Sequence, residues 1–210
     1  SGSVIHLYAA WEKLRDKVQL WEGGPYWAAT NIGADEPWES GYYFWWGDTV
    51  GYKRENDKWV ASDGSNSNFS FSWFYASTYE KSISTLQSEG WITSDGFLAP
   101  EHDAAKKHWD GDWRMPTRQE LNNLCSKCDW TWTTVNGVDG FLVTGYTGNS
   151  IFLPTTGYRD GMSLCNDDKL GEYWTSTPHR DTEYSYYLCY SGENYYVFWN
   201  CRYVGRCIRP

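Results

Sequence analysis

The sequence contains no apolar stretch as long as the roughly 20 residues that a membrane-spanning helix needs. It also lacks any cluster of Lys or Arg, and its formal net charge is -9. A surface that binds a nucleic-acid backbone needs clustered cations, so we expect no nucleic-acid partner. No basic segment followed by an apolar core opens the chain, and Ser1-Gly2-Ser3 resembles a cloning remnant. We therefore expect any export signal to have been removed.

Enzyme motifs are also missing. The four His residues stand in no recognisable catalytic setting, and the sequence contains neither a GxSxG elbow nor a glycine-rich phosphate loop. Cys125 and Cys128 have the spacing of half a zinc knuckle or of a redox pair. No second pair accompanies them, so we interpret them as ordinary helix-end cysteines. Asn166, Asp167 and Asp168 are interpreted as a solvated loop rather than as a calcium site. We expect no catalytic residue, no cofactor and no metal.

Aromatic residues are abundant: they make up 19% of the chain, with 15 Trp and 17 Tyr. The mean hydropathy is nevertheless negative, so the core must be built largely from rings that carry polar groups, and many rings should be half exposed. The length of 210 residues fits one domain with a proper core. The even count of six cysteines permits a disulfide framework, but a chain of this size does not require one.

Residues 1–17 are predicted to hold the tag remnant and an amphipathic helix, because Val4, Leu7, Trp11, Leu14 and Val18 are spaced three and four apart. We expect this helix to pack on its own domain; the alternative is a docking helix through which the chain self-associates.

The remainder, residues 18–210, is expected to form a single domain. Residues 50–100 are rich in Ser, Asn and Asp and are predicted to be a long loop insertion with short elements.

Boundary signals predict two short helices. Pro100 opens the first, and it ends before Gly111. Thr117 and Glu120 form a capping box at the start of the second. Asn136-Gly137 predicts a tight hairpin turn. Strands are predicted at VQLW, YWAATNI, YYFWWGDT, SIFLP, EYWTSTP, YSYYLCY, NYYVFWNCRY and RCIRP. Helices together with a run of antiparallel strands indicate an α+β domain.

Several segments occur in a specific order: WAATNIGADEPWESGYYFWWGDT, DAAKKHWDGDWRMPTRQEL, NGVDGFLVTGYTGNSIFLPTTGYRDG and EYWTSTP, followed by the closing strands. Together they resemble the Fibrobacter-type major paralogous domain family, whose members are surface and secreted proteins of gut anaerobes and of their phages. The resemblance spans about residues 18–210. It implies a C-type-lectin-like fold of the kind shared with formylglycine-generating enzymes. Those enzymes use a metal held by paired cysteines; Cys201 and Cys207 stand in the right part of this chain, but the surrounding motif is absent.

The last segment, Tyr184 to Pro210, combines a regular framework of Tyr, Gly and Val with side chains of no shared chemistry. Some members of the family resemble variable proteins of diversity-generating retroelements, in which a reverse transcriptase miscopies template adenines into the 3' end of the gene. Changes at the adenines of Asn codons would give the residues found at most of these positions. Trp199 is the exception, because changing adenines alone does not convert an Asn codon into a Trp codon.

The resemblance therefore implies a non-enzymatic ligand-binding domain, with residues 175–210 as its variable binding region. The expected ligand-binding residues are His179, Arg180, Tyr184, Asn194, Tyr196, Phe198, Trp199, Asn200, Tyr203, Val204 and Arg206. Exposed rings there would act as binding anchors. The expected ligand is a protein or a glycan on another cell or particle, and the expected location is extracellular, on a cell surface or on a phage particle. The alternative is a structural or adhesive surface module without programmed variation, and carbohydrate binding is one role open to such a module.

Two structural expectations follow. We expect Val197 to point inward and Tyr196, Phe198, Asn200, Val204 and Arg206 to form a contiguous exposed surface. A further set of rings is expected to be core: Tyr26, Trp27, Trp45, Trp46, Trp113, Trp174, Tyr186 and Tyr187.

Overall fold

The computed structural model describes residues 16–56, 58–65, 71–72, 74–109, 111–192 and 194–210. The predicted amphipathic helix lies outside these residues, except that Val18, the last position of its apolar stripe, belongs to strand β1. No helix among the described residues is long and apolar enough to cross a membrane.

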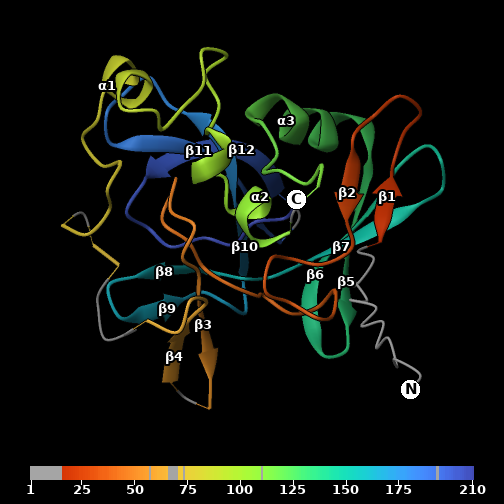
Figure 1. Cartoon of the computed structure of the whole chain (residues 1–210). Helices are drawn as coiled ribbons and strands as arrows, with labels where there is room; N and C mark the ends of the chain where they lie inside the picture. The colour runs from red at the N-terminus through yellow and green to blue at the C-terminus, as the bar shows by residue number, and fades with distance from the viewer. Residues whose placement is uncertain (1–15, 57, 66–70, 73, 110, 193) are drawn as a thin grey trace, which may run out of the picture.

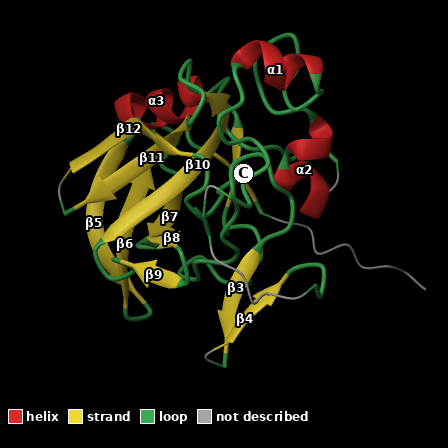
Figure 2. Cartoon of the chain, turned by 90° about the vertical axis from the view of Figure 1, so that its left-hand side faces the viewer, coloured by secondary structure: helices red, strands yellow, loops and turns green. Residues whose placement is uncertain are grey.

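The described residues form antiparallel sheets with a few short helices, a mostly β architecture that fits the α+β class loosely (Figures 1 and 2). One three-stranded sheet consists of β5 (Asp129–Val135), β6 (Val138–Thr144) and β7 (Ser150–Pro154). A second consists of β10 (Leu170–Pro178), β11 (Tyr184–Ser191) and β12 (Asn194–Cys201). Two-stranded pairs are β1 (Lys17–Gln19) with β2 (Tyr26–Ala28), β3 (Tyr52–Glu55) with β4 (Lys58–Ala61), and β8 (Tyr158–Asp160) with β9 (Ser163–Cys165).

The helices are α1 (Ile83–Ser88), a 3-10 turn η1 (Pro100–His102), α2 (Ala104–His108) and α3 (Arg118–Lys127). The single helix predicted after Pro100 is wrong, because Asp103 has an extended backbone that separates η1 from α2. The Asp103 carboxylate caps α2 by accepting hydrogen bonds from the N–H groups of Ala105 and Lys106. It also accepts the N–H of Met115, so this one buried side chain ties α2 to the segment before α3.

The start of α3 and the β5–β6 hairpin are confirmed. Thr117 and Glu120 form the predicted capping box, with both reciprocal hydrogen bonds present. Asn136 and Gly137 have φ values of 50° and 82°, the left-handed conformation that a tight hairpin turn needs. The strand predicted at YYFWWGDT is wrong: that segment contributes only isolated bridges, from Tyr43 to Tyr52 and from Phe44 to Arg206.

Two apolar clusters lie on opposite faces of the β10–β11–β12 sheet. Tyr173, Leu188 and Tyr190 join the first cluster, which includes residues of α3, β6 and β7. Trp174 and Tyr187 belong to the second cluster. Among the rings expected in the core, Trp27, Trp45, Trp46, Trp174 and Tyr187 are buried.

The other three rings of that set are not fully buried. Tyr26, the first residue of β2, is 56% exposed. Trp113 and Tyr186 are half-buried: Trp113 packs against the second cluster, whereas Tyr186 belongs to neither cluster.

Candidate ligand-binding surface

Strand β12 is the outer strand of its sheet and pairs with β11 alone among the described strands. In the antiparallel register Tyr196 lies opposite Cys189, and Phe198 lies opposite Tyr187. Side chains alternate along a strand, so Tyr196 and Phe198 share one face while Val197 lies on the other. Helix α3 packs on this sheet, and Val197 joins the first apolar cluster. The inward orientation of Val197 and the outward orientation of Tyr196 and Phe198 are therefore confirmed.

The exposed rings of β12 contact one another. The exposed fractions of Tyr196, Phe198 and Trp199 are 51%, 43% and 39%. Phe198 meets Tyr196 edge to face, with ring centroids 6.0 Å apart, and stacks on Trp199 at 4.3 Å. Aromatic pairs in these geometries stabilise each other beyond the burial of their area. The rings thus form an ordered surface rather than three independent side chains.

This surface continues beyond β12. Trp199 stacks on the ring of His179 at 5.1 Å and meets Tyr186 edge to face at 6.4 Å. The guanidinium of Arg118, the first residue of α3, lies 4.0 Å from the centroid of Tyr186. We call the six side chains together the aromatic strip: Arg118, His179, Tyr186, Tyr196, Phe198 and Trp199. The sequence analysis did not identify Arg118 and assigned Tyr186 to the core. The one sequence feature that could have indicated Arg118 is its position at the start of a capped helix.

His179 is held as a neutral ring. It is buried, and its Nδ1 accepts a hydrogen bond from the backbone N–H of Asp181. Burial lowers the pKa of His179 below its ordinary value, although the nearby Asp181 carboxylate opposes this effect. The ring that supports Trp199 is therefore uncharged near neutral pH.

The expectation of exposure is wrong for Val204 and Arg206, both of which are buried. The chain turns back after β12 and passes between strands, so that Arg206 bridges to Phe44 and Cys207 bridges to Tyr173. Arg206 Nε donates a 2.6 Å hydrogen bond to Glu172 Oε2. A side chain in this position cannot contact a ligand.

Two aromatic neighbours complete the environment of Arg206. Its guanidinium lies 4.4 Å from the ring centroid of Trp174 and 4.0 Å from that of Tyr187. A positive charge over aromatic faces in a dry site is attracted by both rings. Arg206 is therefore a structural residue beneath the aromatic strip.

Two further arginines anchor the closing segment. Arg202 donates to the carbonyl oxygens of Thr78, Lys81 and Tyr184. Arg209 Nε donates to Asn31 Oδ1, and its Nη1 donates to backbone carbonyls of residues 28 and 29. Both side chains are buried. The segment that follows β12 is thus attached to distant parts of the chain by guanidinium groups.

The remaining expected site residues differ in exposure. Arg180 and Asn194 are exposed, whereas Tyr184, Asn200 and Tyr203 are half-buried. Asn200 Oδ1 accepts the N–H of Cys201 at 2.7 Å, and Tyr203 packs edge to face on Tyr79 at 5.3 Å. The expected site residues whose rings contact one another are therefore Tyr196, Phe198, Trp199 and His179, of which His179 is itself buried.

The six cysteines are all free thiols. Burial raises the pKa of Cys125 to about 12 and that of Cys128 to about 11, which disfavours the thiolate that redox chemistry or zinc binding requires. Within the described part of the chain, no three His, Cys, Asp or Glu side chains are grouped to hold a metal ion.

Comparison with protein-family models finds no match for this chain, and neither the search of curated proteins nor that of solved structures finds a similar one.

Proposed function

We propose that this chain is a non-enzymatic ligand-binding domain that contacts its ligand through the aromatic strip. The observation that carries the proposal is the continuous set of mutually packed rings along the outer strand β12. Tyr196 and Phe198 lie on one face, and Trp199, which shares the face of Val197, stacks on both Phe198 and His179. Clustered Tyr and Trp side chains supply large contact area at low conformational-entropy cost, which is why they dominate binding interfaces. A protein or glycan on another cell or particle is the proposed ligand.

We further propose that the chain belongs to the Fibrobacter-type major paralogous domain family, that it has a C-type-lectin-like fold, and that it acts outside the cell, on a cell surface or on a phage particle. Retroelement-driven variation is proposed for β12. The exposed positions Asn194, Tyr196 and Phe198 support this part, because exposed side chains can be exchanged at little cost in stability. Buried Val204 and Arg206 are removed from the variable set.

The coding DNA tests the variation. We expect a neighbouring reverse-transcriptase gene and a template repeat that differs from this 3' end at adenines only. The differences should fall in the codons of Asn194, Tyr196 and Phe198 and spare that of Arg206. If no template repeat exists, or if it varies codon 206 as freely as codon 196, programmed display on β12 is rejected and the adhesive-module alternative gains support.

Binding is tested with a display library that randomises residues 194, 196, 198 and 199. The control library randomises 202, 204, 206 and 207 on the same scaffold. We expect the first library to express as folded domains and to yield binders to an arbitrary soluble target protein, and the control to yield neither. Equal folding of both libraries, or failure of the first to yield binders, contradicts the proposed binding surface.

A further inference from the structure

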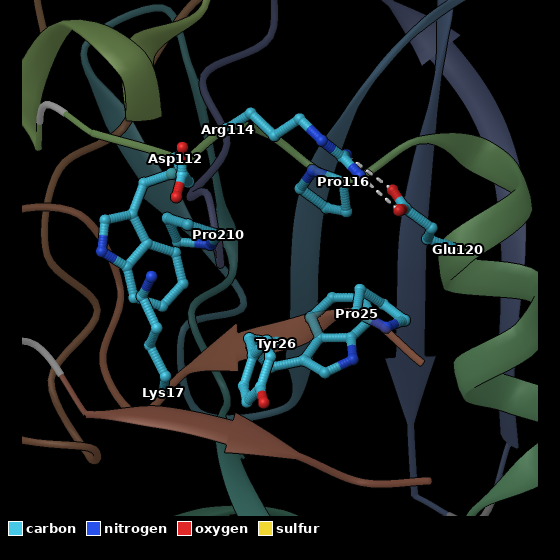
Figure 3. Close-up of a pocket in the computed structure, with 10 residues that line it drawn as sticks. Lys17, Pro25, Tyr26, Asp112, Arg114, Pro116, Glu120 and Pro210 are labelled. Atoms are coloured by element: carbon cyan, nitrogen blue, oxygen red, sulfur yellow. Dashed lines mark hydrogen bonds and ion pairs between the residues drawn. The ribbon is translucent and has the colours of Figure 1, made fainter. Parts of the chain in front are cut away.

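A pocket of about 330 Å³ lies between the β1–β2 pair and the segment that leads into α3 (Figure 3). Its volume lies at the small end of the range for ligand pockets, which is roughly 300 to 1,000 Å³. None of the expected ligand-binding residues lines it. The pocket is therefore separate from the expected ligand-binding residues.

The walls combine aromatic rings with prolines. The rings of Tyr26, Trp27 and Trp113 line the pocket together with Pro25, Pro116 and Pro210. Tyr26 is 56% exposed, although residues of its size usually bury most of their surface. The Tyr26 ring lies at the pocket beside half-buried Trp113, and no side chain among the described residues covers it.

The pocket is largely preformed. Arg114 and Glu120 form a two-pronged ion pair with N–O distances of 2.8 and 2.5 Å on one side of the opening (Figure 3). Glu120 is also held by Thr117, whose backbone N–H donates to Oε2 at 2.8 Å. On another side, the N–H of Ala28 donates to the carbonyl of Pro210 at 2.8 Å. A ligand would therefore bind without first ordering these walls.

The charges around the pocket cancel. Lys17 and Arg114 are cationic, and Asp112 and Glu120 are anionic. Lys17 Nζ already lies 5.5 Å from the centroid of the Trp113 ring, so a cationic ligand would compete with it there. An anionic ligand would meet two carboxylates, and a wholly apolar ligand would remove water from charged groups without replacing their hydrogen bonds. The remaining class is a neutral ligand with an apolar face and hydrogen-bonding edges.

We propose that this pocket binds a neutral sugar ring, as a site separate from the aromatic strip. A pyranose has C–H faces that pack on aromatic and proline walls, and its hydroxyl groups at the edge both donate and accept hydrogen bonds. The Lys17, Asp112, Arg114 and Glu120 side chains supply donors and acceptors for such an edge. The proposal is independent of the proposed function of β12, because the two sites share no residue.

The test is an NMR titration of the full chain with neutral oligosaccharides, namely trimers of glucose and of N-acetylglucosamine. A cationic glucosamine trimer, an anionic galacturonate trimer and a proline-rich decapeptide are the comparison probes. We expect saturable binding of a neutral trimer, with shifts of the indole N–H signals of Trp27 and Trp113 and none at Trp199. Tighter binding of a charged trimer or of the peptide, or absence of saturable binding by both neutral trimers, overturns the proposal.

Tyr26→Ala is the decisive variant, because an exposed ring is removed with little effect on folding. We expect affinity to fall about tenfold or more, which corresponds to a loss of about 1.4 kcal/mol. The matched control is Tyr196→Ala, which removes a ring of similar exposure, 51% against 56%, from the aromatic strip. Binding that is unchanged in Tyr26→Ala, or that falls equally in the control, contradicts a sugar site at this pocket.

Discussion

At the scale of single residues, the closing segment distinguishes side chains that bind from side chains that hold the fold. Tyr196 and Arg206 are both irregular residues of the same segment, yet one is half exposed and the other is fully buried in an ion pair with Glu172. Sequence alone does not separate them, because residues 204–210 are all buried once the chain has turned after Cys201. The division follows from the path of the backbone.

The buried ion pair gives the first prediction. Arg206→Met should lower the free energy of unfolding by about 3 to 5 kcal/mol, because Glu172 would be left as an unpaired charge in a dry site. Replacing both residues by Met should restore part of this loss. Arg180→Met is the control: its side chain is 88% exposed, and a change within about 0.5 kcal/mol is expected. Urea unfolding measures all variants. Equal stability of the two Arg variants would show that Arg206 does not hold the fold.

His179 gives a prediction about pH. Its pKa is lowered in the folded protein chiefly by burial, so the unfolded chain binds more protons once the pH falls below the ordinary value of about 6.5. The free energy of unfolding should therefore decrease as the pH falls from about 6.5 toward the lower folded pKa. The difference between wild type and His179→Gln, measured by urea midpoints across this range, isolates the contribution. Parallel pH profiles for the two proteins would contradict it.

At the scale of helices and strands, the sequence predicted the features that depend only on residues close together in the chain. The capping box of α3 and the Asn136-Gly137 turn depend on neighbouring residues, and both were correct. The strand predicted near Tyr43 is wrong, because the segment makes only isolated bridges, and one of its two partners, Arg206, comes from a distant part of the chain. The pocket escaped prediction for the same reason: Tyr26, Trp113 and Pro210 meet only through tertiary packing.

The capping box also supports the pocket, and this gives a third prediction. Thr117→Ala removes the hydroxyl that accepts the N–H of Glu120 and should cost about 1 kcal/mol of stability. The Thr117 hydroxyl also donates to Glu120 Oε2 at 3.0 Å, so its loss removes one of the contacts that orient this carboxylate, and binding of a neutral sugar should weaken as well. Thr182→Ala, at an exposed position outside any helix, is the matched control. Thermal unfolding and the sugar titration measure the two effects, and a Thr117 variant as stable as the control would refute the role of the cap.

At the scale of the whole molecule, stability is concentrated away from the exposed face of β12. The buried side chains that hold this part of the fold lie elsewhere: the rings of Trp174 and Tyr187 and the guanidinium groups of Arg202, Arg206 and Arg209. On one face of the β10–β11–β12 sheet, the second apolar cluster includes side chains of β10 and β11 but none of β12. Tyr196 and Phe198 of β12 are exposed. A fold arranged in this way tolerates exchange of its outer strand's exposed residues.

The last prediction tests that arrangement directly. Simultaneous replacement of Asn194, Tyr196 and Phe198 by Ser should cost little stability, because these side chains are exposed and fill no internal space. Trp174→Ala should instead cost about 3 to 5 kcal/mol, since it opens a cavity under the sheet and removes the indole hydrogen bond to the Phe44 carbonyl. For a chain of this size each kcal/mol lowers the melting temperature by roughly 2 to 4 °C. Calorimetry should therefore find the triple variant within a few degrees of wild type and Trp174→Ala roughly 6 to 20 °C below it. Melting temperatures in the reverse order would mean that the β12 rings stabilise the fold. Positions that stabilise the fold cannot accept arbitrary side chains, so the proposed variation at β12 would be contradicted.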